Sequence, residues 1–158
     1  MKRNLSLLLL LCLFFSISLK AAMPQKRVLC IAEQGTPHQG FCDAAKAWLD
    51  RRKGELNIET TWVADLSKLP QGFFKQFSVV LMLNYPPYSA PHAWSKDAAR
   101  DFERYIDEGQ GCFIGFHHAT LLGDIFGAGE MWQWFSVFMG GIRWKDYIST
   151  LTDATVNV

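Results

Sequence analysis

Apolar residues along this chain form short continuous runs that alternate with amphipathic stretches. Continuous apolar runs occupy residues 28–32, 77–83 and 112–115, the pattern of strands buried on both faces of a parallel sheet. An alternating run over residues 58–63 predicts one further, shorter strand. Two sets of apolar residues recur at helical spacing, Phe41, Ala44, Ala45, Trp48 and Leu49 in the first and Ala98, Phe102, Tyr105 and Ile106 in the second. Strands separated by helices predict βαβ units and a doubly wound, mostly parallel α/β domain.

Capping residues mark the ends of the two expected helices. Gly54 is the expected end of the first helix, and Ser95 is the expected N-cap of the second. Gly109 and Gly111 follow the second helix and lead into the strand at 112–115. No Gly-x-Gly-x-x-Gly motif follows a strand, so the sequence does not predict a dinucleotide site.

Residues 1–22 have the pattern of a secretory signal peptide. Lys2 and Arg3 open the chain, residues 5–19 are apolar apart from serines, and Ala21 and Ala22 follow. An apolar run of about 15 residues is short of the roughly 20 needed to span a bilayer, although an uncleaved N-terminal anchor is the alternative. We therefore expect a secreted or periplasmic domain over residues 23–158, with membrane contact only through the signal segment.

Composition changes when this segment is set aside. The 158-residue chain has a net charge of +1, but residues 1–22 hold three basic and no acidic side chains. Thirteen Lys and Arg then remain against fifteen Asp and Glu, a net charge of −2, which argues against a nucleic-acid partner. Three cysteines remain, Cys30, Cys42 and Cys112. An odd number does not indicate a disulfide framework, and we expect Cys30 and Cys112 to be buried thiols.

Histidines gather where a parallel sheet binds its ligands, in the loops at the carboxyl ends of the strands. His38 follows the first strand, and His117 and His118 directly follow the strand at 112–115. Gly115 and His117 occupy the position of a nucleophile elbow, but no Ser or Cys stands there. Acyl transfer, including glutaminase chemistry, therefore lacks its nucleophile. His117 is a candidate general acid/base or metal ligand, and its alternative role is to fix the turn through backbone hydrogen bonds.

The remaining candidates are weaker. A divalent metal such as zinc could be held by His38 and His117 with Asp124 or Glu130, although no His-x-x-x-His or His-Glu-x-x-His spacing is present. Asp124 is also a candidate catalytic acid, and a solvated loop carboxylate is its alternative. Because adjacent residues diverge in direction, only one of His117 and His118 is expected to face the cleft.

An aromatic segment follows these residues, made up of Trp132, Trp134, Phe135, Phe138 and Trp144. Aromatic rings of this kind either line a cleft that binds flat sugar faces or belong to the core. His92 lies before a helix in a Pro-flanked loop, where we expect a surface role. We assign substrate binding to Asn84, His118 and Trp134.

Several of these segments together resemble the trehalose-utilisation (ThuA-like) family. The residues that carry the resemblance are the strand at 28–32 with its Gly-x-x-His loop, the strand at 79–84, the helix at 102–109, the turn Gly115-Phe116-His117-His118-Ala119-Thr120, Trp134-Phe135 and Gly140-Gly141. The similarity extends from about Val28 to Tyr147. It implies a flavodoxin-like fold of the class I glutamine amidotransferase type, in which Gly-x-His replaces the cysteine elbow.

The resemblance also implies a function. It indicates carbohydrate catabolism on trehalose-like or keto-disaccharide glycosides, by a hydrolase or lyase whose site contains His38 and His117. His118 departs from the pattern, because a small residue is more usual there. Domains of this family continue further, whereas Thr155 begins a strand shortly before the chain stops, so we expect a fold truncated at the C-terminus. The alternative is a non-catalytic sugar-binding or interaction domain on the same scaffold.

Overall fold

The computed structural model of the chain describes residues 23–32, 38–83, 94–116, 119 and 132–141. Its elements, in chain order, are β1 (Lys26–Ile31), α2 (Gln39–Leu56), β2 (Ile58–Val63), the 3-10 helix η1 (Phe74–Gln76), β3 (Val79–Met82), α3 (Lys96–Asp107), β4 (Cys112–Gly115) and α4 (Gln133–Phe138). The four strands form one parallel sheet in the order β2-β1-β3-β4. The four strands and the two helices that the apolar pattern predicted are all present.

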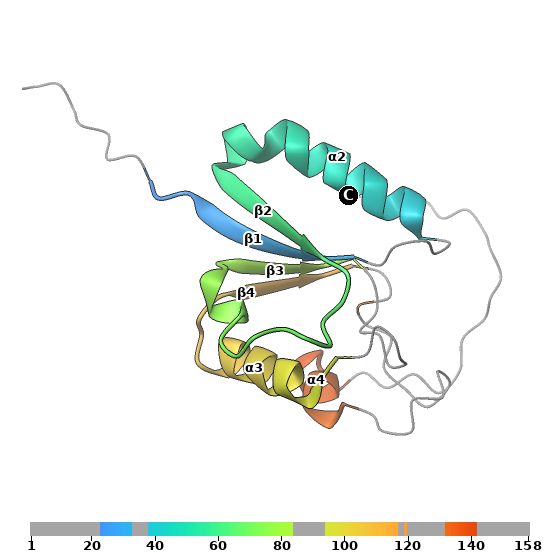
Figure 1. The fold of residues 1–158 in the computed structure, drawn as a ribbon, viewed down its shortest axis with the longest axis vertical. Coiled ribbons are helices and arrows are strands. Elements are labelled where there is room, and N and C mark those ends of the chain that lie inside the picture. Colours follow the sequence, from blue (N-terminus) through green and yellow to red (C-terminus); the bar gives the residue numbers. More distant parts are fainter. Residues whose placement is uncertain (1–22, 33–37, 84–93, 117–118, 120–131, 142–158) are drawn as a thin grey trace, which may run out of the picture.

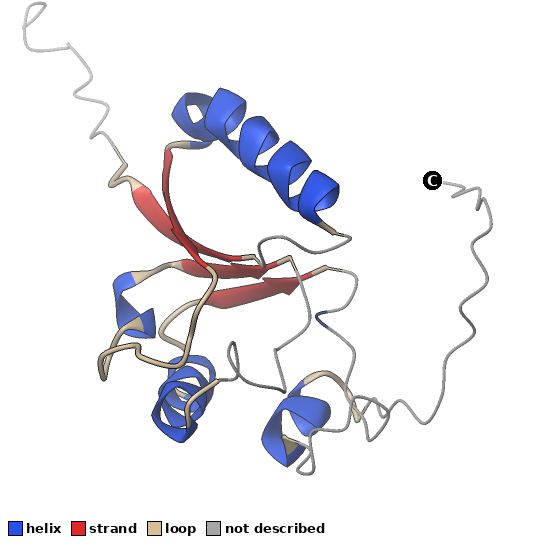
Figure 2. Ribbon diagram, turned by 45° about the vertical axis from the view of Figure 1, so that its right-hand side comes forward, coloured by secondary structure: helices blue, strands red, loops and turns tan. Residues whose placement is uncertain are grey.

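Helices cover both faces of this sheet. Helix α2 lies on one face, and η1, α3 and α4 lie on the other (Figures 1 and 2). The register pairs Ile31 of β1 with Val63 of β2 on one side and with Met82 of β3 on the other. This arrangement confirms the predicted doubly wound α/β class, with a sheet whose described strands are all parallel.

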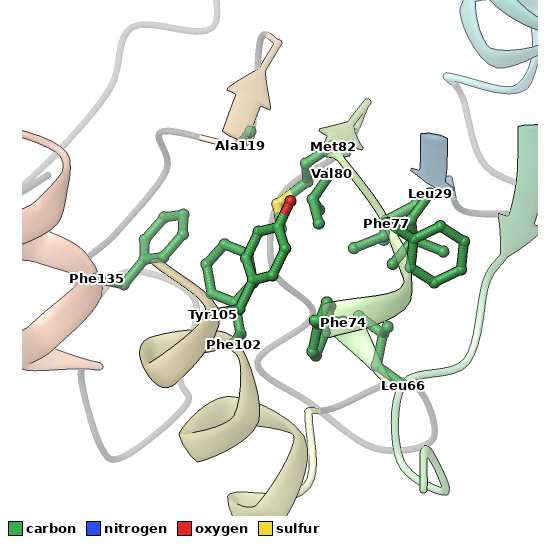
Figure 3. Packing of buried hydrophobic residues seen from close by; sticks show 11 residues of the cluster. Leu29, Leu66, Phe74, Phe77, Val80, Met82, Phe102, Tyr105, Ala119 and Phe135 are labelled. Carbon is green, nitrogen blue, oxygen red and sulfur yellow. The ribbon is translucent and has the colours of Figure 1, made fainter. Parts of the chain in front are cut away.

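The larger core lies between the sheet and α3. Phe102 and Tyr105 of α3 are almost completely buried and pack with Phe74 of η1 and with Val80 and Met82 of β3 (Figure 3). Phe102 is central to this cluster, because its ring contacts eight other aromatic rings with centroids 5.3–6.4 Å away. A smaller core on the other face joins α2 to β1, β2 and β3.

One charged residue is buried beside the larger core. Asp101 of α3 is only 7% exposed, and its carboxylate accepts hydrogen bonds from the backbone N–H of Gly72 at 2.9 Å and of Phe74 at 3.4 Å. Arg104 donates a further hydrogen bond to it at 3.0 Å. Asp101 thus ties α3 to the segment that leads into β3. Its place on the buried stripe of the helix, three residues after Ala98, is the sequence signal that could have identified it.

The helix ends agree with the sequence at one position and differ at another. The Oγ of Ser95 accepts a hydrogen bond from the backbone N–H of Ala98 at 3.0 Å, which confirms the predicted N-cap of α3. The expectation that Gly54 ends the first helix is wrong, because α2 continues to Leu56. Asn57 ends it instead, with a left-handed φ of 51° that asparagine tolerates well.

The cysteines also divide into two groups. Cys30 and Cys42 are buried, as expected for Cys30, but Cys112 is exposed and the prediction for it is wrong. Cys112 opens β4, which ends the described sheet, and no described helix covers β4 on the α2 face. Burial, and to a smaller extent the charge of Asp50, raises the pKa of the Cys30 thiol to about 12, so this thiol stays protonated and unreactive at neutral pH.

The predicted signal peptide, residues 1–22, lies outside the described residues. Among the residues that are described, no helix is long and apolar enough to cross a membrane.

Candidate functional site

The strand order places the ligand-binding edge of the sheet. After β1 the chain crosses to β2 on one side, and after β3 it crosses to β4 on the other. The carboxyl ends of β1 and β3 are therefore neighbours at a topological switch point, where doubly wound sheets bind ligands. A hydrogen bond from the N–H of Leu83 to the carbonyl of Ile31, 3.0 Å long, holds these two ends together.

His38 stands at this edge, directly before α2. It is half-buried, and its carbonyl oxygen accepts a hydrogen bond from the N–H of Cys42 at 3.1 Å. His38 is the N-cap residue of α2, yet its side chain makes no capping hydrogen bond to the helix. The backbone of His38 thus starts the helix, and its imidazole is not used for capping.

Gly115 ends β4 in a turn that has no room for a larger residue. A Cβ atom at Gly115 would lie 2.9 Å from the ring of Phe113 and 3.0 Å from the Cβ of Ala119. The ring of Phe113 cannot easily give way, because it packs against Phe102, Phe135 and Phe138. Glycine in the Gly-x-His turn is therefore required by packing.

Backbone hydrogen bonds fix both sides of this turn. The N–H of Phe116 donates to the carbonyl of Met82 at 2.9 Å, and the N–H of Ala119 donates to the carbonyl of Phe116 at 2.9 Å. Ala119 is completely buried. His117 and His118 stand between Phe116 and Ala119 in the sequence and lie outside the described residues.

Most of the other predicted site residues also lie outside the part of the chain that the structure describes. Asn84, Asp124 and the weaker candidates His92 and Glu130 lie outside the described residues, so their roles stay predictions. Within the part of the chain that the structure describes, no three His, Cys, Asp or Glu side chains gather as metal ligands. His38 is the one member of the suggested metal set that lies in that part, and metal binding also stays a prediction.

The aromatic segment belongs largely to the core. The indole N–H of Trp132 donates to the carboxylate of Glu103 at 2.6 Å, and that of Trp134 donates to Asp107 at 3.2 Å. Trp134 also stacks on Phe138 with ring centroids 5.2 Å apart. These contacts attach α4 to α3 and confirm the core alternative for the four described residues of the segment, whereas Trp144 lies outside the described residues. Substrate binding by Trp134 stays a prediction.

An apolar groove opens on the α2 face of the sheet. It has a volume of about 470 Å³ and is lined by apolar side chains of α2 and of all four strands. Phe41, Trp48, Ile114 and Phe116 line it and are each between 42% and 49% exposed. The ring centroids of Phe41 and Phe116 lie 6.2 Å apart. The groove exists because α2 packs toward β1 and β2, while no described helix covers β4 on this face (Figure 1).

The fold and this edge define a doubly wound α/β protein, the class in which ligands are expected at the β1/β3 switch point. No protein-family model matches the chain, and no curated protein matches it. A solved structure of a ThuA-like protein from Bacteroides uniformis does match, with a TM-score of 0.62 and 26% sequence identity. The match covers 78% of this chain and 46% of that protein. It confirms the resemblance to the ThuA-like family and the fold class that the resemblance implied.

Proposed function

We propose that this chain is an exported ThuA-like protein of carbohydrate catabolism that acts on trehalose-like or keto-disaccharide glycosides. The observation that carries the proposal is the match to a ThuA-like structure, together with the position of His38 at the carboxyl edge of the sheet. The chain spans less than half of the matched protein, so the activity of a whole protein of that kind comes to it only as part of this proposal.

In the proposed site, His117 acts as general acid/base and His38 assists it. The tight packing around Gly115 supports this assignment, because it fixes Phe116 and Ala119 on either side of His117 in the sequence. Asp124 supplies a carboxyl group to the same reaction, and Asn84, His118 and Trp134 bind the sugar. An imidazole can both accept and donate a proton near neutral pH, which suits bond cleavage without a covalent nucleophile.

A divalent metal such as zinc is the second role open to His38 and His117. Histidine nitrogen is a preferred zinc ligand, and a carboxylate such as Asp124 would complete a set of three. In that arrangement the ion would polarise the glycosidic or keto oxygen. Elemental analysis of the purified full chain distinguishes a metal-binding pair from an acid/base pair.

Product formation tests the proposal. The full chain is incubated with trehalose, other disaccharides and their 3-keto forms, and free sugars are followed by NMR. We expect a free hexose or keto-hexose to accumulate from at least one of these glycosides. Calorimetric binding of a glycoside without any product would instead support the non-catalytic sugar-binding alternative. If no glycoside is bound and no product forms, both the catalytic proposal and the sugar-binding alternative are rejected.

A further inference from the structure

A second, smaller cavity lies at the same edge of the sheet as His38. It has a volume of about 110 Å³ and lies between the first half of α2 and the ends of β1 and β2. Its lining consists of Ala32, Gln39, Cys42, Asp43, Lys46, Trp62, Val63 and Ala64. Ala32 directly follows β1 and Val63 ends β2, and the N–H of Ala32 donates a hydrogen bond to the carbonyl of Val63 at 3.1 Å. The cavity therefore opens at the ligand-binding edge, and its wall begins one residue after His38.

Sequence spacing brings the polar side chains of this cavity together. Gln39, Asp43 and Lys46 are spaced i, i+4 and i+7 along α2, so they share one face of the helix. The Nε2 of Gln39 donates a hydrogen bond to Oδ1 of Asp43 at 2.7 Å. Trp62 comes from β2 and packs in the core on the α2 face, and the Nζ of Lys46 lies 5.7 Å from the centre of its ring. The cavity thus combines an amide, a carboxylate, an ammonium group and an aromatic wall.

This set of groups fits a neutral, hydroxyl-rich ligand. A carboxylate accepts hydrogen bonds from hydroxyls, an ammonium group donates to them, and an amide does both. The opposite charges of Asp43 and Lys46 offset one another, so a simple anion or cation gains no net attraction here, whereas a neutral sugar can hydrogen-bond to both groups. At about 30 Å³ per water, the volume corresponds to roughly four waters. That space accommodates one edge of a sugar ring with its hydroxyls.

We propose that this cavity is a sugar subsite, in which Gln39, Asp43 and Lys46 hold the hydroxyls of one sugar unit against Trp62. The proposal rests on the proposed carbohydrate function and adds residues that set its specificity. It places the held sugar unit directly beside His38, so that the bond to be cleaved would lie toward the β1/β3 switch point.

Calorimetric titration of the full chain with trehalose tests this subsite, with glycine and inorganic phosphate as additional probes. The variants are Asp43→Ala and Trp62→Leu. Asp50→Ala is the matched control, because Asp50 is an exposed acid of the same helix outside the cavity. Circular dichroism verifies that each variant is folded. If Trp62→Leu does not fold, Lys46→Met replaces it as a second variant, this time at a polar residue of the cavity lining. We expect trehalose affinity to fall at least tenfold in Asp43→Ala and to remain unchanged in Asp50→Ala, with no binding of glycine or phosphate.

The possible outcomes separate this subsite from the proposed function. If the unmodified chain binds trehalose and Asp43→Ala binds it equally well, the subsite is wrong while the carbohydrate function stands. If glycine or phosphate binds in an Asp43-dependent way and sugars do not, the cavity serves another class of ligand and the sugar assignment fails. If no sugar binds to the unmodified chain at all, the subsite and the proposed function fail together.

Discussion

Gly115 packs directly against Ala119, so closely that a Cβ atom on Gly115 would lie 3.0 Å from the Cβ of Ala119. The two residues enclose Phe116, His117 and His118 in the sequence. Their contact therefore determines how tightly the chain turns between β4 and the buried Ala119. If His117 is the catalytic residue, this packing is part of what positions it.

Gly115→Ala should destabilise the protein and lower any activity that depends on His117. Overpacking of this kind typically costs about 1–3 kcal/mol, because the ring of Phe113 is held by Phe102, Phe135 and Phe138. Urea unfolding measures the change in the free energy of unfolding. Gly54→Ala is the control, since nothing lies within 4 Å of a Cβ there and α2 continues through it. We expect that variant to be stabilised by about 0.5–1 kcal/mol. Equal stability of both variants would contradict the packing argument.

Asp101→Ala should lower stability by about 2–4 kcal/mol. It removes the carboxylate that accepts from the backbone N–H groups of Gly72 and Phe74, and hydrogen bonds to a charged acceptor are each worth about 1.5–3 kcal/mol. Thermal unfolding followed by circular dichroism measures the loss. Asp97→Ala is the matched control, because Asp97 lies on the same helix but is exposed and pairs with the exposed Arg100. A loss for Asp97→Ala as large as that for Asp101→Ala would show that burial of Asp101 is not the cause.

The apolar pattern predicted most of the fold because strands and helices have distinct periods. It placed β1, β2 and the N-cap at Ser95 correctly, since burial and capping are local properties. It missed the end of α2, because Asn57 rather than a glycine adopts the left-handed conformation. It also misjudged Cys112, because an apolar run does not reveal whether a helix covers the strand on a given face.

The candidate site was predicted only in part. The loops that carry the histidines could be located from strand order alone, and His38 is at the expected edge. The subsite residues Gln39, Asp43 and Lys46 were missed, although their i, i+4, i+7 spacing was a usable signal. They become a site only with Trp62, which the parallel pairing of β1 and β2 brings beside α2, and that is a long-range relationship.

Ile114→Lys should reduce the binding of a fluorescent hydrophobic dye such as ANS at only a small cost in stability. Ile114 is 46% exposed and lines the apolar groove, so a charge there removes exposed apolar surface at small cost. Ile31→Lys is the comparison, since Ile31 is only 4% exposed in the core and its replacement should unfold the protein. If the folded Ile114→Lys variant bound as much dye as the unmodified chain, the groove would not be the surface that binds the dye.

Stability should decline at alkaline pH. Burial raises the pKa of Cys30 from 9.0 to about 12 and that of Tyr105 from 10.0 to about 12. A group whose pKa is higher in the folded state binds its proton more tightly there, so its contribution is complete below pH 9 and is lost as the pH rises toward 12. The midpoint temperature of thermal unfolding should fall steadily from pH 8 to pH 11. Relative to its own value at pH 8, the midpoint of Cys30→Ala should fall less than that of the unmodified chain. A midpoint independent of pH would contradict the burial of both groups.

The most direct measurement is kcat/KM for the glycoside that yields product, in the full chain and in its histidine variants. The account predicts that His117→Gln lowers kcat/KM by about 10²–10⁴-fold, the usual contribution of a general acid/base, and that His38→Gln lowers it by a smaller factor. His92→Gln, the matched control with an expected surface role, should leave it unchanged. Equal kcat/KM in the unmodified chain and in His117→Gln would contradict the account.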